Sequence, residues 1–373
     1  METTVDASFA RFVPLAELGL QDVEILRLIL RGGSVIDWRR LNFEGRADVD
    51  RFLRLSLFDT SDPLDAARLR EILRQAVDYL RASFHYRVAD RVANPDEIQD
   101  LFLMASGRFA PDRFRRIACV VLKVMHCIHH VEARELRFQA KIAEADFQAR
   151  VAERVRDFAM GMQAAGFPIV DLTGNLKTRE SLITKLLSKK ETLAAQIYDK
   201  VRYRIVTRDR ADVLPVLHHL ATHLFPFNFV VPGQTENSLI DFRETVEGTP
   251  SLRRLIPRLQ LDLDLERRER RERRRNGDGN RFSAASYRVL NFIADLPVRL
   301  DRWIEPDAQG RYPNGRIGFG LVEFQIVDEA AARQNEQGDA SHERYKARQH
   351  RRVLRRLSRG LVVPKRIGAK NTG

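Results

Sequence analysis

Hydrophobic and polar residues alternate most regularly near the C-terminal end of the chain, in the stretch 321–327. In an extended strand the side chains point alternately to opposite faces. One face would carry the apolar residues Val322, Phe324 and Ile326, and the other would carry Glu323 and Gln325. The pattern therefore predicts a strand that is buried on one side and presents a carboxylate on the other.

A second alternating stretch, 201–207, is also predicted to be a strand. It carries Arg202 and Arg204 and follows Asp199. Acidic residues from two strands of one sheet, Asp199 and Glu323, can converge on a divalent metal, and nearby arginines suit phosphate. We therefore expect the residues that carry the chemistry to lie where the strands at 201–207 and 321–327 come together.

The remaining pattern divides the chain into two parts. Residues 14–107 show three- and four-residue spacing of apolar positions, interrupted by Pro, Gly, Asp and Asn, which predicts helices. One of these helices covers 63–80, and another begins near Asn94 as its N-cap. A longer helical pattern, 111–166, predicts a long helix with one or two breaks.

After residue 166 the pattern changes to shorter mixed elements. Helices are predicted at 181–193, 211–224 and near 341–359, and further strands at 227–231, 287–297 and 318–327. The expected fold is α+β, an N-terminal all-helical region followed by a mixed β-sheet with flanking helices. We expect a helical domain over 1–150, a second domain over 151–360 with an insertion at 253–281, and a basic tail at 361–373.

Charge is concentrated in the C-terminal third. The chain has 64 Lys and Arg against 51 Asp and Glu, and residues 251–373 hold 28 of the former and 16 of the latter, so this third carries +12 of the net +13. Such a surface attracts nucleotides or polyanions. The Glu/Arg run 266–275 fits either a solvated charged helix or an arm that binds phosphate or RNA.

Cysteine and histidine spacing gives weaker signals. Cys119 and Cys127 lie eight positions apart in one helical pattern, about 12 Å along the axis, which is too far for a disulfide. His126 and His130 have the spacing of a helical metal pair, although histidines of this kind are more often packed or exposed, which is the interpretation we favour. Since no basic stretch leads into an apolar run and no segment has ~20 apolar residues, we expect a cytoplasmic protein without a membrane span.

Four short motifs lie between residues 174 and 346. They are Asn-Leu-Lys-Thr-Arg-Glu-Ser-Leu-Ile-Thr-Lys at 175–185, Ile-Tyr-Asp-Lys-Val-Arg-Tyr-Arg-Ile at 197–205, Ser-Tyr-Arg-Val-Leu-Asn at 286–291, and Val-Glu-Phe-Gln-Ile at 322–326 followed by 335–346. In this order they resemble the RelA/SpoT alarmone-synthetase domain. That family has a nucleotidyltransferase-like fold and transfers pyrophosphate from ATP to the 3′-hydroxyl of GDP or GTP.

The resemblance implies a role for each matching residue. Asp199 and Glu323 would be the catalytic residues and the Mg²⁺ ligands. ATP would be bound by Lys177, Ser181, Lys185 and Arg204. The acceptor would be bound by Tyr287, which stacks on guanine in the family, and by Asn291. The supporting frame would be Gln325, Glu336, His342, Tyr345 and Lys346.

Several positions depart from the family pattern. Asn175 replaces an arginine, Asn291 replaces a histidine, and Ser286 replaces a glycine. A neutral amide cannot form the bidentate phosphate contact of an arginine. The family's hydrolase needs a His-Asp pair, and no such dipeptide occurs in the chain. An active protein would therefore synthesise the alarmone and not hydrolyse it.

Three functions are therefore compatible with the sequence. The first is a Mg²⁺-dependent pyrophosphokinase with ATP and GDP or GTP as substrates. The second keeps the fold but takes RNA, such as the 3′ end of tRNA, as the acceptor. The third is a catalytically degenerate protein that binds nucleotide or RNA without turnover.

Overall fold

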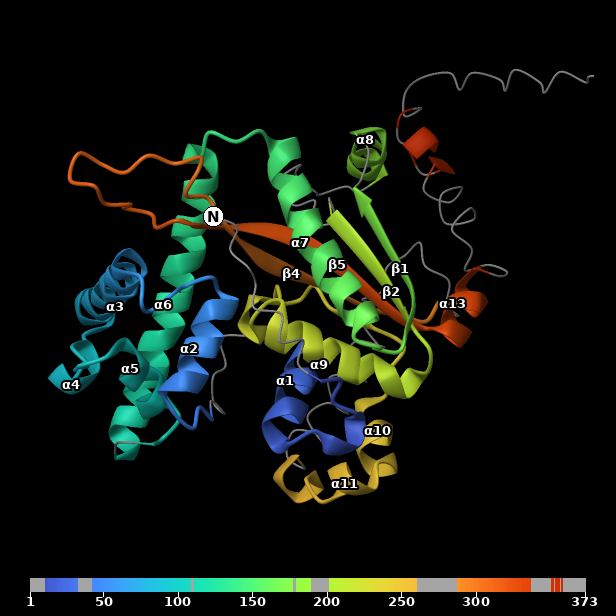
Figure 1. Cartoon of the computed structure of the whole chain (residues 1–373), viewed down its shortest axis with the longest axis horizontal. Coiled ribbons are helices and arrows are strands. Elements are labelled where there is room, and N and C mark those ends of the chain that lie inside the picture. Colours follow the sequence, from blue (N-terminus) through green and yellow to red (C-terminus); the bar gives the residue numbers. More distant parts are fainter. Residues whose placement is uncertain are drawn as a thin grey trace, which may run out of the picture.

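The computed structural model describes residues 11–32, 42–108, 111–176, 179–188, 201–259 and 287–336, together with 350, 351, 353–355 and 357. Within these residues a mixed sheet carries helices on both of its faces (Figure 1). This is the α+β class, with a mixed sheet and flanking helices, that the sequence predicts.

The sheet has the strand order β1-β2-β5-β4-β3 in the described part of the chain. The strands are β1 Ile169–Leu176, β2 Val201–Thr207, β3 Glu236–Asn237, β4 Leu290–Arg299 and β5 Ile317–Asp328. Only the central pair, β2 and β5, is parallel among these neighbours. The predicted strands at 201–207, 287–297 and 318–327 are confirmed as β2, β4 and β5.

Two predictions about strands were incomplete or wrong. β1 was not predicted, because most of its side chains are exposed and it lacks an apolar alternation. The predicted strand at 227–231 is a 3₁₀ turn, Phe227–Phe229, followed by a single bridge between Val230 and Ala294. Pro226 and Pro232 flank this segment, and proline provides no backbone N–H for a ladder.

The helices follow the predicted apolar periodicity closely. They are α1 Leu20–Arg31, α2 Arg46–Leu55, α3 Pro63–Phe84, α4 Asp90–Ala93, α5 Ile98–Ala105, α6 Asp112–Gln139, α7 Glu144–Ala164, α8 Arg179–Ser188, α9 Val213–His223, α10 Phe242–Gly248, α11 Pro250–Arg253 and α13 Glu329–Glu336, with 3₁₀ turns at Leu15–Glu17 and Arg210–Asp212.

The helix boundaries have local causes. The long pattern at 111–166 breaks once, between α6 and α7, where Ala140 is extended and the Lys141 N–H donates to the Trp303 carbonyl at 2.7 Å. The prediction for Asn94 was wrong: Asn94 follows the short α4, and α5 begins after Glu97, whose N–H is capped by Asp100.

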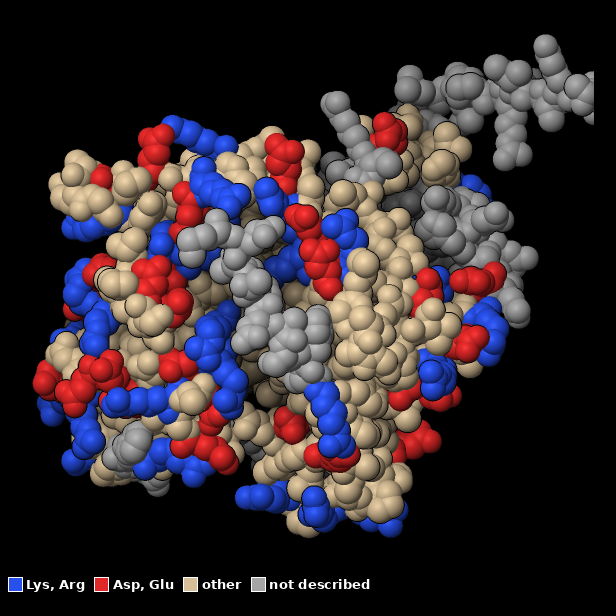
Figure 2. Space-filling view, in the orientation of Figure 1, with Lys and Arg blue, Asp and Glu red and all other residues tan. Residues whose placement is uncertain are grey.

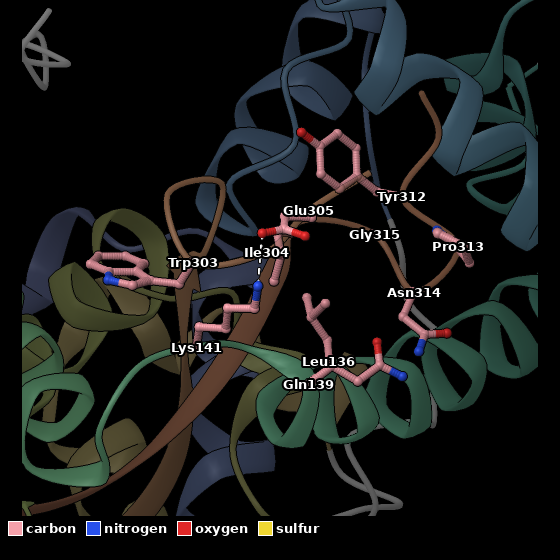
Figure 3. Close-up of a pocket in the computed structure, with 10 residues that line it drawn as sticks. All are labelled: Leu136, Gln139, Lys141, Trp303, Ile304, Glu305, Tyr312, Pro313, Asn314 and Gly315. Atoms are coloured by element: carbon pink, nitrogen blue, oxygen red, sulfur yellow. Dashed lines mark hydrogen bonds and ion pairs between the residues drawn. The ribbon is translucent and has the colours of Figure 1, made fainter. Parts of the chain in front are cut away.

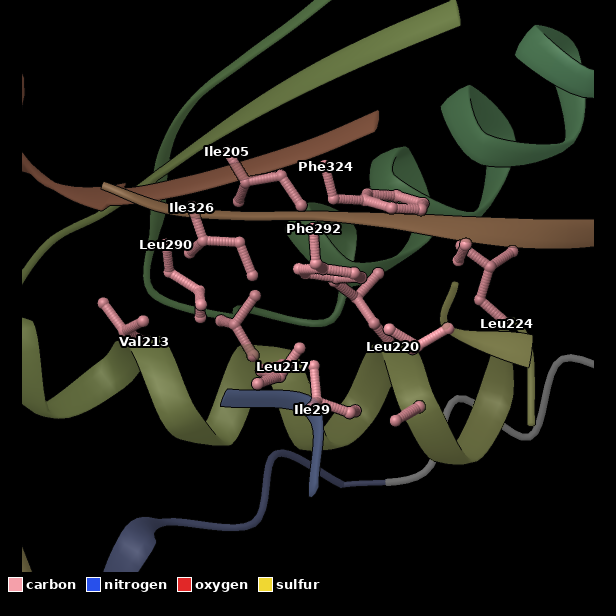
Figure 4. Packing of buried hydrophobic residues seen from close by; sticks show 14 of the residues in the cluster. Ile29, Ile205, Val213, Leu217, Leu220, Leu224, Leu290, Phe292, Phe324 and Ile326 are labelled. Atoms are coloured by element: carbon pink, nitrogen blue, oxygen red, sulfur yellow. The ribbon is translucent and has the colours of Figure 1, made fainter. Parts of the chain in front are cut away.

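One face of the sheet is covered by α7 and α9. Figure 4 shows α9 directing apolar side chains at the sheet, and Ile29 of α1 reaches the same cluster. The strands contribute Ile205, Leu290, Phe292, Phe324 and Ile326, and all five are fully buried. At Gly320 the sheet touches α7 so closely that an added Cβ would lie 2.3 Å from a Val151 methyl group.

The opposite face is divided between α6 and a polar surface. The α6 helix packs on the end of β5 that contains Phe319, and its remaining side joins α2–α5 in a second hydrophobic cluster. An ionic network also connects the helical part to the strands: Arg299 and Arg316 both bind Asp65, which is 2 % exposed. The face beyond α6, where Glu323 and Gln325 lie, carries polar side chains.

Both described cysteines are free thiols, as the spacing predicts. In the same part of the chain, no helix combines the length and apolar character required to cross a bilayer.

Candidate functional site

The polar face of the sheet is formed by residues that strand pairing aligns across all five strands. Neighbours in register point to the same face of a sheet. One row contains, in strand order, Thr173, Arg204, Gln325, Asn291 and Glu236. The next row contains Asn175, Arg202, Glu323 and Ile293. The face therefore has two arginines on one side and two acids toward the other.

Glu323 lies at the centre of this face and is only 5 % exposed. Its Oε2 accepts a hydrogen bond from Arg202 Nε at 2.8 Å, and its Oε1 accepts one from Gln325 Nε2 at 3.2 Å. The carboxylate is thus held by charge and geometry in one orientation. Gln325 was predicted to support Glu323, and the two side chains do meet. The contact with Arg202 was not predicted.

Arg204 projects from β2 beside Arg202. Its Nη1 lies 3.3 Å from an Oε1 of Glu336, at the end of α13. The helix α13 begins directly after β5, so the chain turn that follows the strand brings Glu336 back to the polar face. Two predicted residues, Arg204 and Glu336, therefore lie together.

Tyr287 precedes β4 and is fixed through the backbone around it. The Ser238 hydroxyl donates to the Tyr287 carbonyl at 3.0 Å and accepts from the Val289 N–H at 3.0 Å. Asn335 of α13 binds both the N–H and the carbonyl of Arg288, at 2.9 and 2.7 Å. Burial raises the pKa of the Tyr287 phenol, and the nearby Arg204, Arg202, Glu323 and Glu236 also act on it. The ring therefore borders the same polar face.

Glu236 is a residue that the sequence analysis missed. It lies in the two-residue strand β3, opposite Asn291, and is half-buried. Burial raises the pKa of its carboxyl group, and the negative charge of Glu323 raises it further. A two-residue strand has no period to detect, so only the register of the folded sheet brings Glu236 to this face.

Other predicted site residues lie outside the described residues. These are Lys177, Asp199, His342, Tyr345 and Lys346. Lys185 belongs to α8, but its side chain is not described, and Ser181 is an exposed residue in the first turn of that helix. The pairing of Asp199 with Glu323 therefore stays a prediction, and so does the arm at 266–275.

The described residues do not complete a metal site by themselves. No group of three His, Cys, Asp or Glu side chains in the described ranges could hold a metal ion. Carboxylate oxygens such as those of Glu323 are ligands that Mg²⁺ prefers in proteins. A Mg²⁺ site on this face needs a further oxygen ligand, the role predicted for Asp199.

The histidine pair is packed against aromatic rings. The rings of His126 and His130 lie 4.3 Å apart between α6 and the sheet, in contact with Phe229. Burial lowers the pKa of His126 to about 3, and His130 Nε2 lies 3.0 Å from Asp295 Oδ2. Of the two alternatives that the sequence analysis favoured over a metal pair, packed or exposed, the structure shows packed histidines.

A separate hollow of about 230 Å³ lies between the end of α6 and the connection from β4 to β5 (Figure 3). Lys141 and Glu305 form an ion pair across it at 2.7 Å, and Trp303 and Tyr312 flank it. The pair neutralises its own charges, and the residues of the polar sheet face do not line this hollow. It is therefore not part of the candidate site.

Charges of both signs cover the outer helices. Figure 2 shows Lys and Arg interspersed with Asp and Glu over α2–α6. Arg74, for example, contacts Glu71 at 2.7 Å and Asp78 at 3.0 Å. A polyanion that approached this surface would therefore meet carboxylates as well as cationic side chains.

Comparison with known proteins gives structural likenesses only. No family model matches the sequence, and no curated protein matches it either. Among solved structures, the chain is similar to the small alarmone synthetase 1 from Bacillus subtilis bound to its product pppGpp, with 15 % identity over 56 % of this chain and 87 % of that chain and a TM-score of 0.31. It is also similar to a GTP pyrophosphokinase family protein from Streptococcus pneumoniae, with 14 % identity, 58 % and 87 % coverage and a TM-score of 0.29.

A third similar structure is the small alarmone synthetase 2 from Bacillus subtilis, with 16 % identity, 56 % and 91 % coverage and a TM-score of 0.28.

Proposed function

We propose that the chain is a nucleotide pyrophosphokinase that transfers pyrophosphate from ATP to the 3′-hydroxyl of GDP or GTP. The observation that carries this proposal is that one sheet face brings Arg202 and Arg204 together with Glu323 and Glu236, and that the Tyr287 phenol lies within electrostatic reach of all four. A phosphate chain and an acceptor nucleoside need these two chemistries side by side.

In the proposed reaction the ribose 3′-oxygen attacks the β-phosphorus of ATP. The new bond joins that oxygen to the β-phosphorus, the bond from the β-phosphorus to the α,β-bridging oxygen breaks, AMP leaves, and the hydroxyl proton passes to solvent. Arginine side chains beside the triphosphate neutralise the charge that spreads over the phosphoryl oxygens. Glu323, held by Arg202 and Gln325, would orient the attacking hydroxyl by accepting its hydrogen bond.

Mg²⁺ belongs to the proposal as a cofactor that Glu323 and Asp199 would bind. When bound, it would neutralise phosphate charge on ATP. Lys177, Ser181 and Lys185 complete the proposed ATP contacts.

The experiment is a transfer assay with labelled ATP, Mg²⁺ and GDP or GTP. We expect a tetra- or pentaphosphate product from the wild-type protein and none from Glu323→Gln. A matched control is Glu329→Gln, because Glu329 pairs with Arg333 on the surface of α13. Equal product from Glu323→Gln and the control would contradict the assignment of Glu323.

One observation favours a second candidate, a nucleotide-binding protein without turnover. The carboxylate of Glu323 is already engaged by Arg202, and an acid bound to a guanidinium has less affinity for a metal ion and for a proton. This candidate predicts that calorimetry detects nucleotide binding while the transfer assay gives no product.

A further inference from the structure

The Arg202 guanidinium and the Glu323 carboxylate are paired with each other at the centre of the polar sheet face. Arg202 Nε donates to Glu323 Oε2 at 2.8 Å, and the register of β2 and β5 places the two residues opposite each other. The Glu323 side chain is 7 % exposed, whereas the Arg202 side chain is 29 % exposed. The proposed reaction needs both groups for other partners, the arginine for phosphate and the carboxylate for the attacking hydroxyl.

The neighbouring arginine of β2 is paired in a similar way, but with an exposed acid. Arg204 Nη1 lies 3.3 Å from Glu336 Oε1, and the Glu336 side chain is 68 % exposed. An ion pair at an exposed position contributes little, whereas a buried carboxylate is costly to separate from its counter-charge. Of the two pairs, the one between Arg202 and Glu323 therefore opposes a competing anion more strongly.

A triphosphate can nevertheless compete with Glu323 for Arg202. A guanidinium binds phosphate through two parallel charge-assisted hydrogen bonds, and a triphosphate carries more negative charge than one carboxylate. The exposed part of the Arg202 side chain is accessible to such a ligand. Separation would not leave Glu323 without a donor, because Gln325 Nε2 donates to its Oε1 at 3.2 Å. The arginine can therefore change partners while the carboxylate stays in position.

We infer that the ion pair between Arg202 and Glu323 is an autoinhibitory contact that opens when ATP binds. ATP takes Arg202 as a phosphate ligand, and Glu323 then accepts the hydrogen bond of the attacking hydroxyl. This inference rests on the proposed function, which places ATP beside Arg202. The free energy that separates the pair is subtracted from the free energy of ATP binding, so removal of the pair should strengthen that binding.

The test measures binding of α,β-methylene ATP to the full-length protein by calorimetry, because this analogue lacks the bridging oxygen whose bond breaks in the reaction. EDTA is present, so that loss of a metal ligand does not enter the comparison. Glu323→Gln removes the competing charge and should bind the analogue about 10-fold more tightly than the wild type, the range of one charge-assisted hydrogen bond. Glu329→Gln, on the surface of α13 beside Arg333, is the control and should bind as the wild type does.

A double-mutant cycle separates partner exchange from simple removal of a negative charge. In the wild type, Arg202 must leave Glu323 before it binds phosphate, so Arg202→Met should weaken binding of the analogue only slightly. In Glu323→Gln the arginine is available at once, and Arg202→Met should weaken binding by about 10-fold more than in the wild type. A through-space effect of the Glu323 charge would be the same with and without Arg202, so the two losses would then be equal.

Nuclear magnetic resonance of the Arg202 Nε–H group keeps the inference testable if Arg202→Met is unstable. Arg202→Lys retains the positive charge and identifies the signal by its disappearance. The signal should shift when the analogue saturates the wild-type protein, because the donor leaves the carboxylate. An unshifted signal, binding to Glu323→Gln that is no tighter than to the wild type, equal losses in the cycle, or no binding of the analogue would each overturn the inference.

The transfer assay separates this inference from the proposed function. Partner exchange by Arg202 without formation of a tetra- or pentaphosphate would leave the exchange standing and remove the proposed function. Product formation by a protein whose Glu323→Gln variant binds the analogue no more tightly would do the reverse.

Discussion

At the scale of single residues, the ion pair between Arg202 and Glu323 places opposite charges next to each other at the centre of the polar sheet face. Their Cα atoms are partners in the parallel ladder between β2 and β5, so the backbone fixes the ion pair. The alternation of each strand could be predicted from the sequence, and so could the polar face of Glu323 and Gln325. The register could not, because it joins residues 121 positions apart and depends on both strands being placed together.

Arg202→Met should destabilise the protein by about 3 kcal/mol, because it breaks an ion pair to a buried carboxylate. Urea unfolding of Arg202→Met and of the wild-type protein measures this loss.

The double variant Arg202→Met, Glu323→Gln serves as the control for this prediction. It removes the buried charge together with its partner, so it should be less destabilised than the sum of the single variants. Strict additivity would show that the ion pair does not contribute as described.

At the scale of elements, the site depends on how closely the helices approach the sheet. The sequence predicts α3, α7 and α9 from their apolar residues. Helices α3 and α7 each bury one stripe, whereas α9 is buried on nearly all sides. It does not predict β1, whose side chains are mostly exposed, or the turn at 227–231, where two prolines flank an apolar run. The sequence does not predict Glu236 as a site residue either, because β3 has only two residues and shows no alternation.

Gly320→Ala tests the contact between β5 and α7. The added methyl group would meet Val151 of α7, a short and rigid side chain, so α7 must shift. We expect a loss of about 2 kcal/mol in the free energy of unfolding, the usual range for overpacking. Thermal or urea unfolding measures the loss.

Val151→Ala provides space for the new methyl group, so the double variant Gly320→Ala, Val151→Ala should be more stable than the sum of the two single losses predicts. A Gly320→Ala protein as stable as the wild type would contradict the close approach of α7.

At the scale of the whole molecule, the helical half and the sheet are joined by buried charge and buried histidines. Arg299 and Arg316 reach from the ends of β4 and β5 to Asp65 of α3, and Arg316 also binds Asp62. The sequence indicated a helical region before the synthetase-like region. It did not indicate this connection, because it consists of single polar residues more than 200 positions apart.

Stability should fall as the pH drops below about 6.5, the ordinary histidine value. Burial lowers the pKa of His126 to about 3 and the pKa of His129 well below its ordinary value. Between pH 6.5 and these lower pKa values, His126 and His129 bind protons in the unfolded chain but stay neutral in the folded chain. Each of these histidines should lower the free energy of unfolding by about 1.4 kcal/mol per pH unit over that pH range.

Urea unfolding between pH 7.5 and 5 measures this slope. His129 packs against Phe58 and Phe319, so His129→Phe retains an aromatic ring there and removes one titrating group. The variant should show a slope smaller by about 1.4 kcal/mol per pH unit. A slope identical to that of the wild type would show that His129 is not held neutral by burial.

The central claim is that the polar sheet face transfers pyrophosphate rather than a single phosphoryl group. Phosphorus NMR of the full-length protein with ATP, GDP and Mg²⁺ tests this most directly, because the leaving nucleotide reports which bond breaks. We predict that AMP and a guanosine 3′-diphosphate 5′-diphosphate accumulate in equal amounts. Accumulation of ADP, or binding of both nucleotides with no new phosphorus signal, would contradict the claim.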